Sequence, residues 1–293
     1  MSPRRRSFSR SSPQRTGRRK PKSDLNYIRT GTGTPPLVFV HGFACSLEDW
    51  RAQVDFFSPT HEVVACDLRA HGATPGRAQE CSIEHYAGDV AALLNNLQLP
   101  PAILVGHSMG TRVVLEAARI DPERVAGLVL IDGSRQGSGN PDEAEAAMEA
   151  AIRAVGFPAF RENAFRQMFF QWSPQAEALL ERSKKLAPDA GRALWTRMVR
   201  WDAEHMDAAL AAVRCPLMAI QSTFVNAERK RVPLGPGQST PYLDLIRDKI
   251  ARARLEVLPG VGHFAQIEAA GQVNRLVSDF IVQYAMALPK ARG

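Results

Sequence analysis

The sequence AILVGHSMG, residues 102–110, joins a four-residue apolar run to the motif Gly-x-Ser-x-Gly. The run is typical of a buried strand, and the residues from Thr111 onward have the pattern of a helix. A serine at such a strand-to-helix turn has a strained backbone, and the turn needs glycine at positions 106 and 110, where a side chain would collide with neighbouring backbone. This arrangement predicts that Ser108 is a nucleophile. The start of the following helix favours negative charge that develops beside it.

Similar apolar runs lie on both sides of this motif, at residues 37–40, 62–66, 128–131, 217–220 and 255–258, with a weaker one at 26–29. Helical patterns separate most of them. Short β-branched runs that alternate with helices are typical of buried parallel strands. The predicted fold class is therefore α/β, with a doubly wound, mostly parallel sheet.

The interval 134–213 breaks this alternation, because it contains amphipathic helical patterns and no convincing strand. Its first helix is expected to begin after Asn140, a good N-cap residue. The expected apolar faces are Met148, Ile152 and Val155 on this helix, Phe165, Met168, Phe169 and Trp172 on a second, and Leu194, Met198 and Trp201 on a third. We interpret the interval as a helical cap inserted into a core of residues 25–133 and 214–293. Most of its aromatic side chains are expected to pack the cap onto the core, and a few to line an apolar pocket.

The net charge of +7 has its origin at the start of the chain, where residues 1–23 contain nine Lys and Arg residues and no acid. The remaining chain is slightly acidic, so it has no broad basic surface for nucleic acid. Residues 1–24 are poor in apolar side chains, and we expect them to form a disordered basic tail. Contact with nucleic acid is expected at most through this tail.

No apolar run approaches the roughly 18 residues that span a bilayer, so no membrane partner is expected. The cysteines have neither the close pairing of a zinc site nor the density of a disulfide framework. They are Cys45, Cys66, Cys81 and Cys215. These features predict reduced thiols and a cytoplasmic setting.

A nucleophilic serine needs a histidine within hydrogen-bond reach and an acid that orients this histidine. Among the seven histidines, His263 lies in PGVGHF, residues 259–264, just after the last apolar run. The order of serine before histidine is the one expected for this architecture. His41, His71 and His107 lie in turns beside other predicted strands, and the other three have no strand-end context. His263 is therefore the predicted general base.

The chain resembles the α/β-hydrolase superfamily through HGF after the first strong strand run, DLRAHG at 67–72, the motif at 106–110, and Gly262-His263. The resemblance extends over residues 26–285. It implies an oxyanion hole formed by the backbone N–H groups of Phe43 and Met109. It also implies a reaction that needs no cofactor.

The acid departs from the usual pattern of that superfamily, most members of which have it in a Gly-x-x-Asp turn after the strand that corresponds to residues 217–220. Here residues 221–228 are QSTFVNAE, and no aspartate occupies the expected turn. Some members, including certain dehalogenases, take the acid from the end of the preceding strand, which here gives Asp132. Asp132 is the predicted acid, Glu228 is the main alternative, and Asp244 is a third candidate.

Together these residues predict a serine hydrolase that attacks an ester carbonyl with Ser108 and releases the acyl-enzyme with water. An apolar cap favours a small, mainly apolar ester as the small-molecule partner, as in carboxylesterases. The same triad serves lactonases, carbon–carbon bond hydrolases and cofactor-free perhydrolases, and these alternatives stay open. An alternative of another class is a ligand receptor of the same fold with little turnover, which the missing standard acid favours. The sequence does not predict an oligomeric state.

Overall fold

The structure, a computed structural model, describes residues 24–226, 228 and 230–287. Within these residues, seven strands form one sheet in the order β1-β3-β2-β4-β5-β6-β9. Their bounds are β1 Tyr27–Thr30, β2 Leu37–Val40, β3 Val63–Cys66, β4 Ala102–His107, β5 Val125–Ile131, β6 Leu217–Gln221 and β9 Arg254–Val257. Strand β1 pairs antiparallel with β3, and all other neighbours are parallel. The predicted fold class is confirmed.

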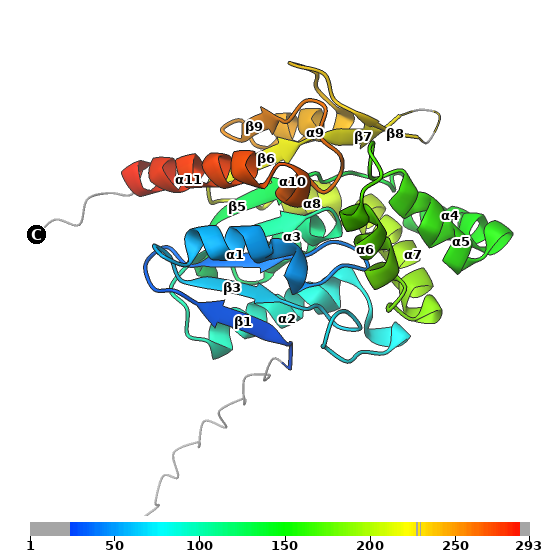
Figure 1. The fold of residues 1–293 in the computed structure, drawn as a ribbon, viewed down its shortest axis with the longest axis horizontal. Coiled ribbons are helices and arrows are strands. Elements are labelled where there is room, and N and C mark those ends of the chain that lie inside the picture. Colours follow the sequence, from blue (N-terminus) through cyan, green and yellow to red (C-terminus); the bar gives the residue numbers. More distant parts are fainter. Residues whose placement is uncertain (1–23, 227, 229, 288–293) are drawn as a thin grey trace, which may run out of the picture.

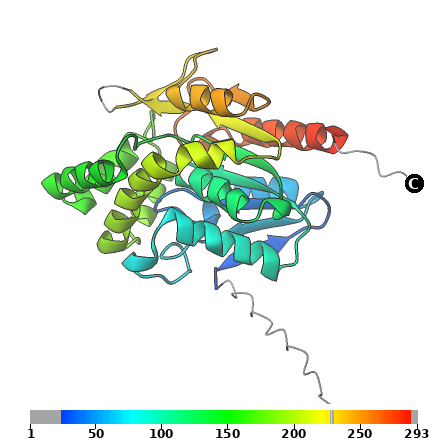
Figure 2. The same cartoon turned by 180° about the vertical axis from the view of Figure 1, so that it is seen from behind.

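Helices cover both faces of this sheet. Figure 1 shows α1 (Arg51–Phe57) and α11 (Ala270–Ala287) in front of it, and Figure 2 shows α2 (Ile83–Asn96) and α3 (Met109–Ile120) in front when the molecule is seen from behind. Side chains of β2 alternate between two hydrophobic cores: Val38 belongs to the core with α2 and α3, and Phe39 to the core with α1 and α11. Burial on both faces explains why the central strands are continuous apolar runs.

The interval between β5 and β6 contains helices. They are α4 Pro141–Val155, α5 Phe157–Arg166, α6 Pro174–Ser183, α7 Pro188–Glu204 and α8 Met206–Ala211. Figure 1 shows α4 to α7 gathered beyond one end of the sheet. Helix α4 begins as predicted, because the Asn140 side chain accepts the N–H groups of Asp142 and Glu143. Of the predicted apolar face of α4, Met148 and Ile152 are buried, whereas Val155 is exposed.

The second predicted cap helix is shorter than the sequence indicated, because α5 ends at Arg166 and Met168, Phe169 and Trp172 follow it in a connecting segment. Tertiary contacts hold this segment out of the helix. The carbonyl of Met168 accepts the N–H of His263 at 2.8 Å, and the ring of Phe169 stacks on Phe264. The third predicted face is correct, since Leu194, Met198 and Trp201 are all buried on α7.

After β6 the chain forms a hairpin that the sequence did not indicate, with β7 (Thr223–Val225) antiparallel to β8 (Arg231–Pro233). Helix α9 (Pro241–Lys249), strand β9 and the short helix α10 (Ala265–Glu268) follow it. The short 3-10 helices are η1 Leu47–Trp50, η2 Ala78–Glu80 and η3 Pro122–Arg124.

Three sequence-based expectations concern the chain as a whole. Except for Asp24, the predicted basic tail lies outside the described residues. None of the four cysteines forms a disulfide. In the part of the chain that the structure describes, no helix is both long enough and apolar enough to cross a membrane.

Candidate active site

The predicted site residues lie on loops that leave the carboxyl ends of the parallel strands. Phe43 follows β2, Ser108 follows β4, Asp132 follows β5 and His263 follows β9. Because these strands run parallel in one sheet, their carboxyl ends lie at the same edge of the sheet, which is where ligands bind in open α/β sheets. Residues more than 200 positions apart in the chain are thereby brought together.

Ser108 lies at the sharp turn between β4 and α3, with φ of 53° and ψ of −113°. A non-glycine residue with positive φ is strained, and such strain concentrates at functional sites. The two flanking glycines make the turn possible. A Cβ on Gly106 would lie 2.4 Å from the carbonyl oxygen of Gly110, and a Cβ on Gly110 would lie 2.4 Å from that of Val40. The turn therefore holds the partly exposed Ser108 hydroxyl above the edge of the sheet.

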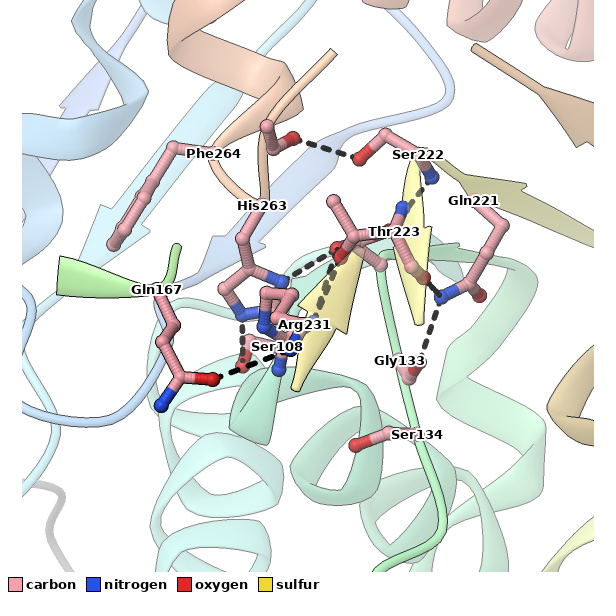
Figure 3. A network of polar contacts seen from close by, with 12 residues as sticks. Ser108, Gly133, Ser134, Gln167, Gln221, Ser222, Thr223, Arg231, His263 and Phe264 are labelled. Carbon is pink, nitrogen blue, oxygen red and sulfur yellow. Dashed lines mark hydrogen bonds and ion pairs between the residues drawn. The ribbon is translucent and has the colours of Figure 1, made fainter. Parts of the chain in front are cut away.

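His263 contacts Ser108 through one ring nitrogen and Asp132 through the other; Figure 3 shows the imidazole and the Ser108 hydroxyl joined by a dashed line. Its Nε2 is 2.8 Å from Ser108 Oγ, and its Nδ1 is 2.5 Å from Asp132 Oδ2. The loop that carries it is fixed at the backbone, because His107 Nε2 donates to the His263 carbonyl at 2.9 Å and the hydroxyl of Ser222 donates to the carbonyl of Gly262 at 2.8 Å. The imidazole is thus oriented at both ring nitrogens, as a serine-activating base requires.

Asp132 is completely buried, and every hydrogen bond to its carboxylate comes from a donor at the same sheet edge. Oδ1 accepts the backbone N–H groups of Ser222 at 2.6 Å and Thr223 at 2.9 Å. Oδ2 accepts the Thr223 hydroxyl as well as His263 Nδ1. The backbone of Asp132 has a positive φ of 48°, so this turn is also strained.

The two other candidate acids lie elsewhere. Glu228 is exposed in the turn between β7 and β8. Asp244 is on α9, where its carboxylate accepts hydrogen bonds from Ser239 and Arg247, both at 2.6 Å. Among the three candidates, the carboxylate in contact with His263 is that of Asp132.

The electrostatics keep His263 neutral and Asp132 ionised at neutral pH. Burial lowers the pKa of His263 to about 4, and the nearby charge of Arg231 acts in the same direction against the opposing effect of Asp132. Burial alone would raise the pKa of Asp132, but the hydrogen bond and charge of His263, the charge of Arg231 and the Thr223 hydroxyl outweigh burial and lower it. A neutral imidazole beside a carboxylate is ready to accept the serine proton.

The predicted oxyanion-hole residues flank Ser108. Met109 is the first residue of α3, so its N–H has no acceptor within the helix. The loop before Phe43 lies against the nucleophile, since a Cβ on Gly42 would be 3.3 Å from the Cβ of Ser108. Neither amide donates to a described backbone acceptor. Both N–H groups are therefore available to an oxygen bound beside Ser108.

A cavity of about 930 Å³ lies between the cap and the core, next to these residues. Apolar side chains from both parts line it, among them Met148, Phe160, Met168, Trp195 and Phe224. Ser108 and His263 do not line it themselves, but residues that contact Phe43 and His263 do. Trp195 packs against the ring of Phe43 with centroids 4.6 Å apart, and Met168 holds the His263 amide. The cavity therefore adjoins the site on the side of the cap.

The structure brings two arginines to the site that sequence reasoning missed. Arg112, on α3, donates to both carboxylate oxygens of Asp202 on α7 at 2.7 Å, and both side chains are almost completely buried. Arg231, on β8, donates from Nη1 to the Thr223 hydroxyl at 2.7 Å, and Nη1 is 3.7 Å from Asp132 Oδ2. A buried arginine has no sequence motif of its own, so nothing in the sequence indicated that Arg112 or Arg231 lies at the site.

Among the described residues, no cluster of three or more His, Cys, Asp or Glu side chains has the arrangement of a metal site. The predicted absence of a cofactor stays a prediction.

Comparison with known proteins gives matches over most of the chain. Residues 37–276 match the model of the alpha/beta hydrolase family. A dihydrolipoyllysine-residue acetyltransferase component of the acetoin cleaving system from Pseudomonas putida is 28% identical over 86% of this chain and 64% of its own length. The chain spans less than two thirds of the first curated relatives that it matches.

Solved structures match over nearly the full length of both chains. A thermophilic esterase from Thermogutta terrifontis matches with a TM-score of 0.71 and 24% identity, over 89% of this chain and 93% of its own. The enol-lactonase from Burkholderia xenovorans LB400 matches with a TM-score of 0.69 and 21% identity, over 88% and 96%. At these identities the likeness establishes a common fold.

Proposed function

The chain belongs to the alpha/beta hydrolase family, and on this premise we propose that it hydrolyses a small, mainly apolar carboxylic ester through an acyl-enzyme on Ser108. The observation that carries the proposal is the unbroken chain of contacts from Ser108 Oγ through His263 to Asp132, at 2.8 and 2.5 Å. These are the distances at which a base accepts a serine proton and a carboxylate orients the base.

The reaction begins when Ser108 Oγ attacks the ester carbonyl carbon and transfers its proton to His263 Nε2. The carbonyl oxygen becomes negatively charged and accepts hydrogen bonds from the N–H groups of Phe43 and Met109, at the N-terminus of α3. Asp132 stabilises the imidazolium through Nδ1. His263 then gives its proton to the leaving alcohol, and the carbon–oxygen bond to the alcohol breaks. Water, activated by the same imidazole, releases the acid and restores Ser108.

The nature of the cavity supports an ester with an apolar body. Its walls are rich in methionine and aromatic side chains from α4, α5 and α7, and such walls bury the apolar parts of small ligands. The thermophilic esterase of the same fold is consistent with this chemistry. The enol-lactonase has the same fold and by its name acts on a cyclic ester, so lactones belong in the substrate panel with carbon–carbon bond and perhydrolysis substrates.

The receptor alternative loses its main support. It depended on the absence of an acid after residues 217–220, and Asp132 at 2.5 Å from His263 supplies a carboxylate from the neighbouring strand. A chain with all three side chains in contact has what repeated turnover requires.

The test is hydrolysis of p-nitrophenyl acetate and p-nitrophenyl butyrate by the full chain and by its Ser108→Ala variant. The proposal predicts steady release of p-nitrophenol over many turnovers, and loss of this release in the variant. Release that stops after about one equivalent contradicts an enzyme of this kind, and unchanged release in the variant contradicts the assignment of Ser108.

A further inference from the structure

Arg231 is a buried cation whose neighbouring carboxylate, that of Asp132, is 3.7 Å away and not hydrogen-bonded to it. Its side chain is 8% exposed, it lies on β8, and it lines the 930 Å³ cavity. Figure 3 shows it in the same network as Ser108 and His263, with Gln167 Oε1 accepting the backbone N–H of Arg231 at 3.2 Å. Burying a guanidinium costs free energy unless an anion compensates its charge, so the partners of Arg231 determine how well this charge is compensated.

Asp132 does not satisfy Arg231. The carboxylate oxygens of Asp132 are already occupied by two backbone N–H groups, the Thr223 hydroxyl and His263. Nη1 of Arg231 is 3.7 Å from Oδ2, beyond hydrogen-bond distance, and it donates instead to the oxygen of the Thr223 hydroxyl. The other side-chain nitrogens, Nε and Nη2, donate to no described acceptor.

Arg112 can be compared with Arg231, because its side chain is also buried and it lies near the same site. Two parallel hydrogen bonds to Asp202 and one to the Ser134 carbonyl compensate Arg112. Arg231 has one hydroxyl in place of these, and burial lowers its pKa. A carboxylate bound from the cavity would give Arg231 the two-oxygen partner that Arg112 already has.

The other cation of the cavity wall is engaged. Among the described lining residues, Arg135 is the second arginine, and its Nη2 is 2.7 Å from the carboxylate of Asp207. Gln167, which also lines the cavity, accepts the backbone N–H of Arg231 through Oε1, so its amide group lies beside the arginine as a further donor. Of the two arginines of the wall, Arg231 is therefore the one without a hydrogen-bonded carboxylate, and it lies next to Asp132. The described lining also includes two acids, Asp244, which Ser239 and Arg247 bind, and Asp248.

We propose that Arg231 is a specificity-determining residue that binds a carboxylate of the substrate. This inference rests on the proposed function and narrows its substrate class to esters with an apolar body and one carboxylate a few carbons from the scissile carbonyl. The guanidinium of Arg231, together with apolar wall residues such as Met168 and Phe224, matches a negative charge on a largely apolar molecule. The monoester of a dicarboxylic acid is the simplest compound of this kind.

The experiment compares the monomethyl esters of succinic, glutaric and adipic acid with methyl pentanoate and methyl hexanoate, followed by base uptake at constant pH. We expect the wild-type protein to have a kcat/KM for one of the charged esters at least tenfold above that for the uncharged esters. Arg231→Gln should lower this value by about 10- to 100-fold, because a charge-assisted pair is lost. The uncharged esters should lose less activity than the charged ones, because for them the variant removes only the effect of Arg231 on the pKa of His263 and Asp132.

Two variants separate recognition from general effects of charge. Arg231→Lys keeps the charge but loses the two-donor geometry, so it should retain part of the preference. Arg254→Gln, on β9, removes another partly buried arginine, one paired with Glu256 and absent from the cavity wall, and it should retain all of the preference. If the Arg231→Gln variant does not fold, the Arg231→Lys variant provides the test. An undiminished preference of this variant for charged over uncharged esters contradicts the inference.

Binding without hydrolysis gives an independent result. Glutarate should raise the melting temperature of Ser108→Ala and should fail to raise that of the double variant with Arg231→Lys to the same extent. Absence of any glutarate effect, no wild-type preference for charged esters, or an equal loss on both ester types in Arg231→Gln overturns the inference. If p-nitrophenyl butyrate is still cleaved in a Ser108-dependent way, the proposed function survives that outcome. If p-nitrophenyl butyrate is not cleaved in a Ser108-dependent way, the proposed function is contradicted, and the effect of glutarate on the melting temperature still tests the role of Arg231.

Discussion

Replacement of Asp132 by asparagine removes one charge from the proposed site and changes almost no volume. The consequence follows from how the carboxylate is held. Oδ1 accepts two backbone N–H groups, those of Ser222 and Thr223. An amide oxygen can take this position and an amide NH₂ cannot, because two N–H donors would then face a third. The oxygen of the new asparagine must therefore point at β7, and its NH₂ must occupy the place of Oδ2.

That NH₂ group would face Nδ1 of His263, now 2.5 Å from Oδ2. Since the amide donates, Nδ1 has to accept, and the single proton of the neutral imidazole moves to Nε2. Nε2 is the atom 2.8 Å from Ser108 Oγ, and a protonated Nε2 cannot take the serine proton. The variant therefore favours the inactive tautomer of His263, protonated on Nε2, although every heavy atom stays close to its position.

Loss of the orienting carboxylate in sites of this type lowers kcat by about 10⁴-fold, or about 5.4 kcal/mol of transition-state stabilisation. The assay is kcat on p-nitrophenyl butyrate, with thermal unfolding of each variant as the check on folding. Glu228→Gln is the matched control, because Glu228 is an exposed acid in the β7–β8 turn, and it should keep near-native kcat. A folded Asp132→Asn variant with kcat within tenfold of the wild type would refute the tautomer argument.

Three further outcomes are expected. Because only neutral His263 can accept a proton and its pKa is lowered to about 4, kcat/KM should stay level as pH falls from about 8 to about 5 and decline below that; an acid limb at or above pH 6.5 would contradict the lowered pKa. Asp202→Ala should destabilise the fold by about 3–5 kcal/mol in urea unfolding, since Arg112 is then buried without an anion. The control Glu162→Ala, at an exposed ion pair, should have little effect. Asn140→Ala should cost about 0.5–2 kcal/mol through loss of the α4 cap, and an unchanged urea midpoint would show that the cap is not needed.

Most of the central sheet could be predicted from the sequence because its inner strands, β2 to β6, are buried on both faces. Runs such as residues 37–40 and 217–220 contain four consecutive apolar side chains, and each observed strand begins or ends within a few residues of its predicted position. The cap was harder, because helix ends there depend on tertiary contacts. Residues 168–172 have helical spacing, yet they leave the helix where Met168 binds the His263 amide.

The β7–β8 hairpin carried no sequence signal. Each of its strands has three residues, and β8 ends in proline, which is uncommon within paired strands. The hairpin is what positions Arg231 near the site, so Arg231 could not be predicted as a site residue without it. Its distance to Asp132 depends on how a loop after β6 folds back, and neither composition nor periodicity contains that information.

Among the site residues, Ser108 and His263 have local signals, a strained glycine-flanked turn and a glycine-rich loop after the last strand. The acid has none, because both Asp132 and Glu228 fit a loop after a neighbouring strand. In the structure the loop after β6, where most members of the superfamily have the acid, instead offers two backbone N–H groups and the Thr223 hydroxyl to Asp132. Here the acid therefore follows β5, and the loop after β6 supplies hydrogen-bond donors to it in place of an acid of its own. The donors also matter for Arg231, which hydrogen-bonds the Thr223 hydroxyl and lies 3.7 Å from Asp132 Oδ2. A second carboxylate in the loop after β6 would pair with the guanidinium and leave less of its charge for the carboxylate of a substrate.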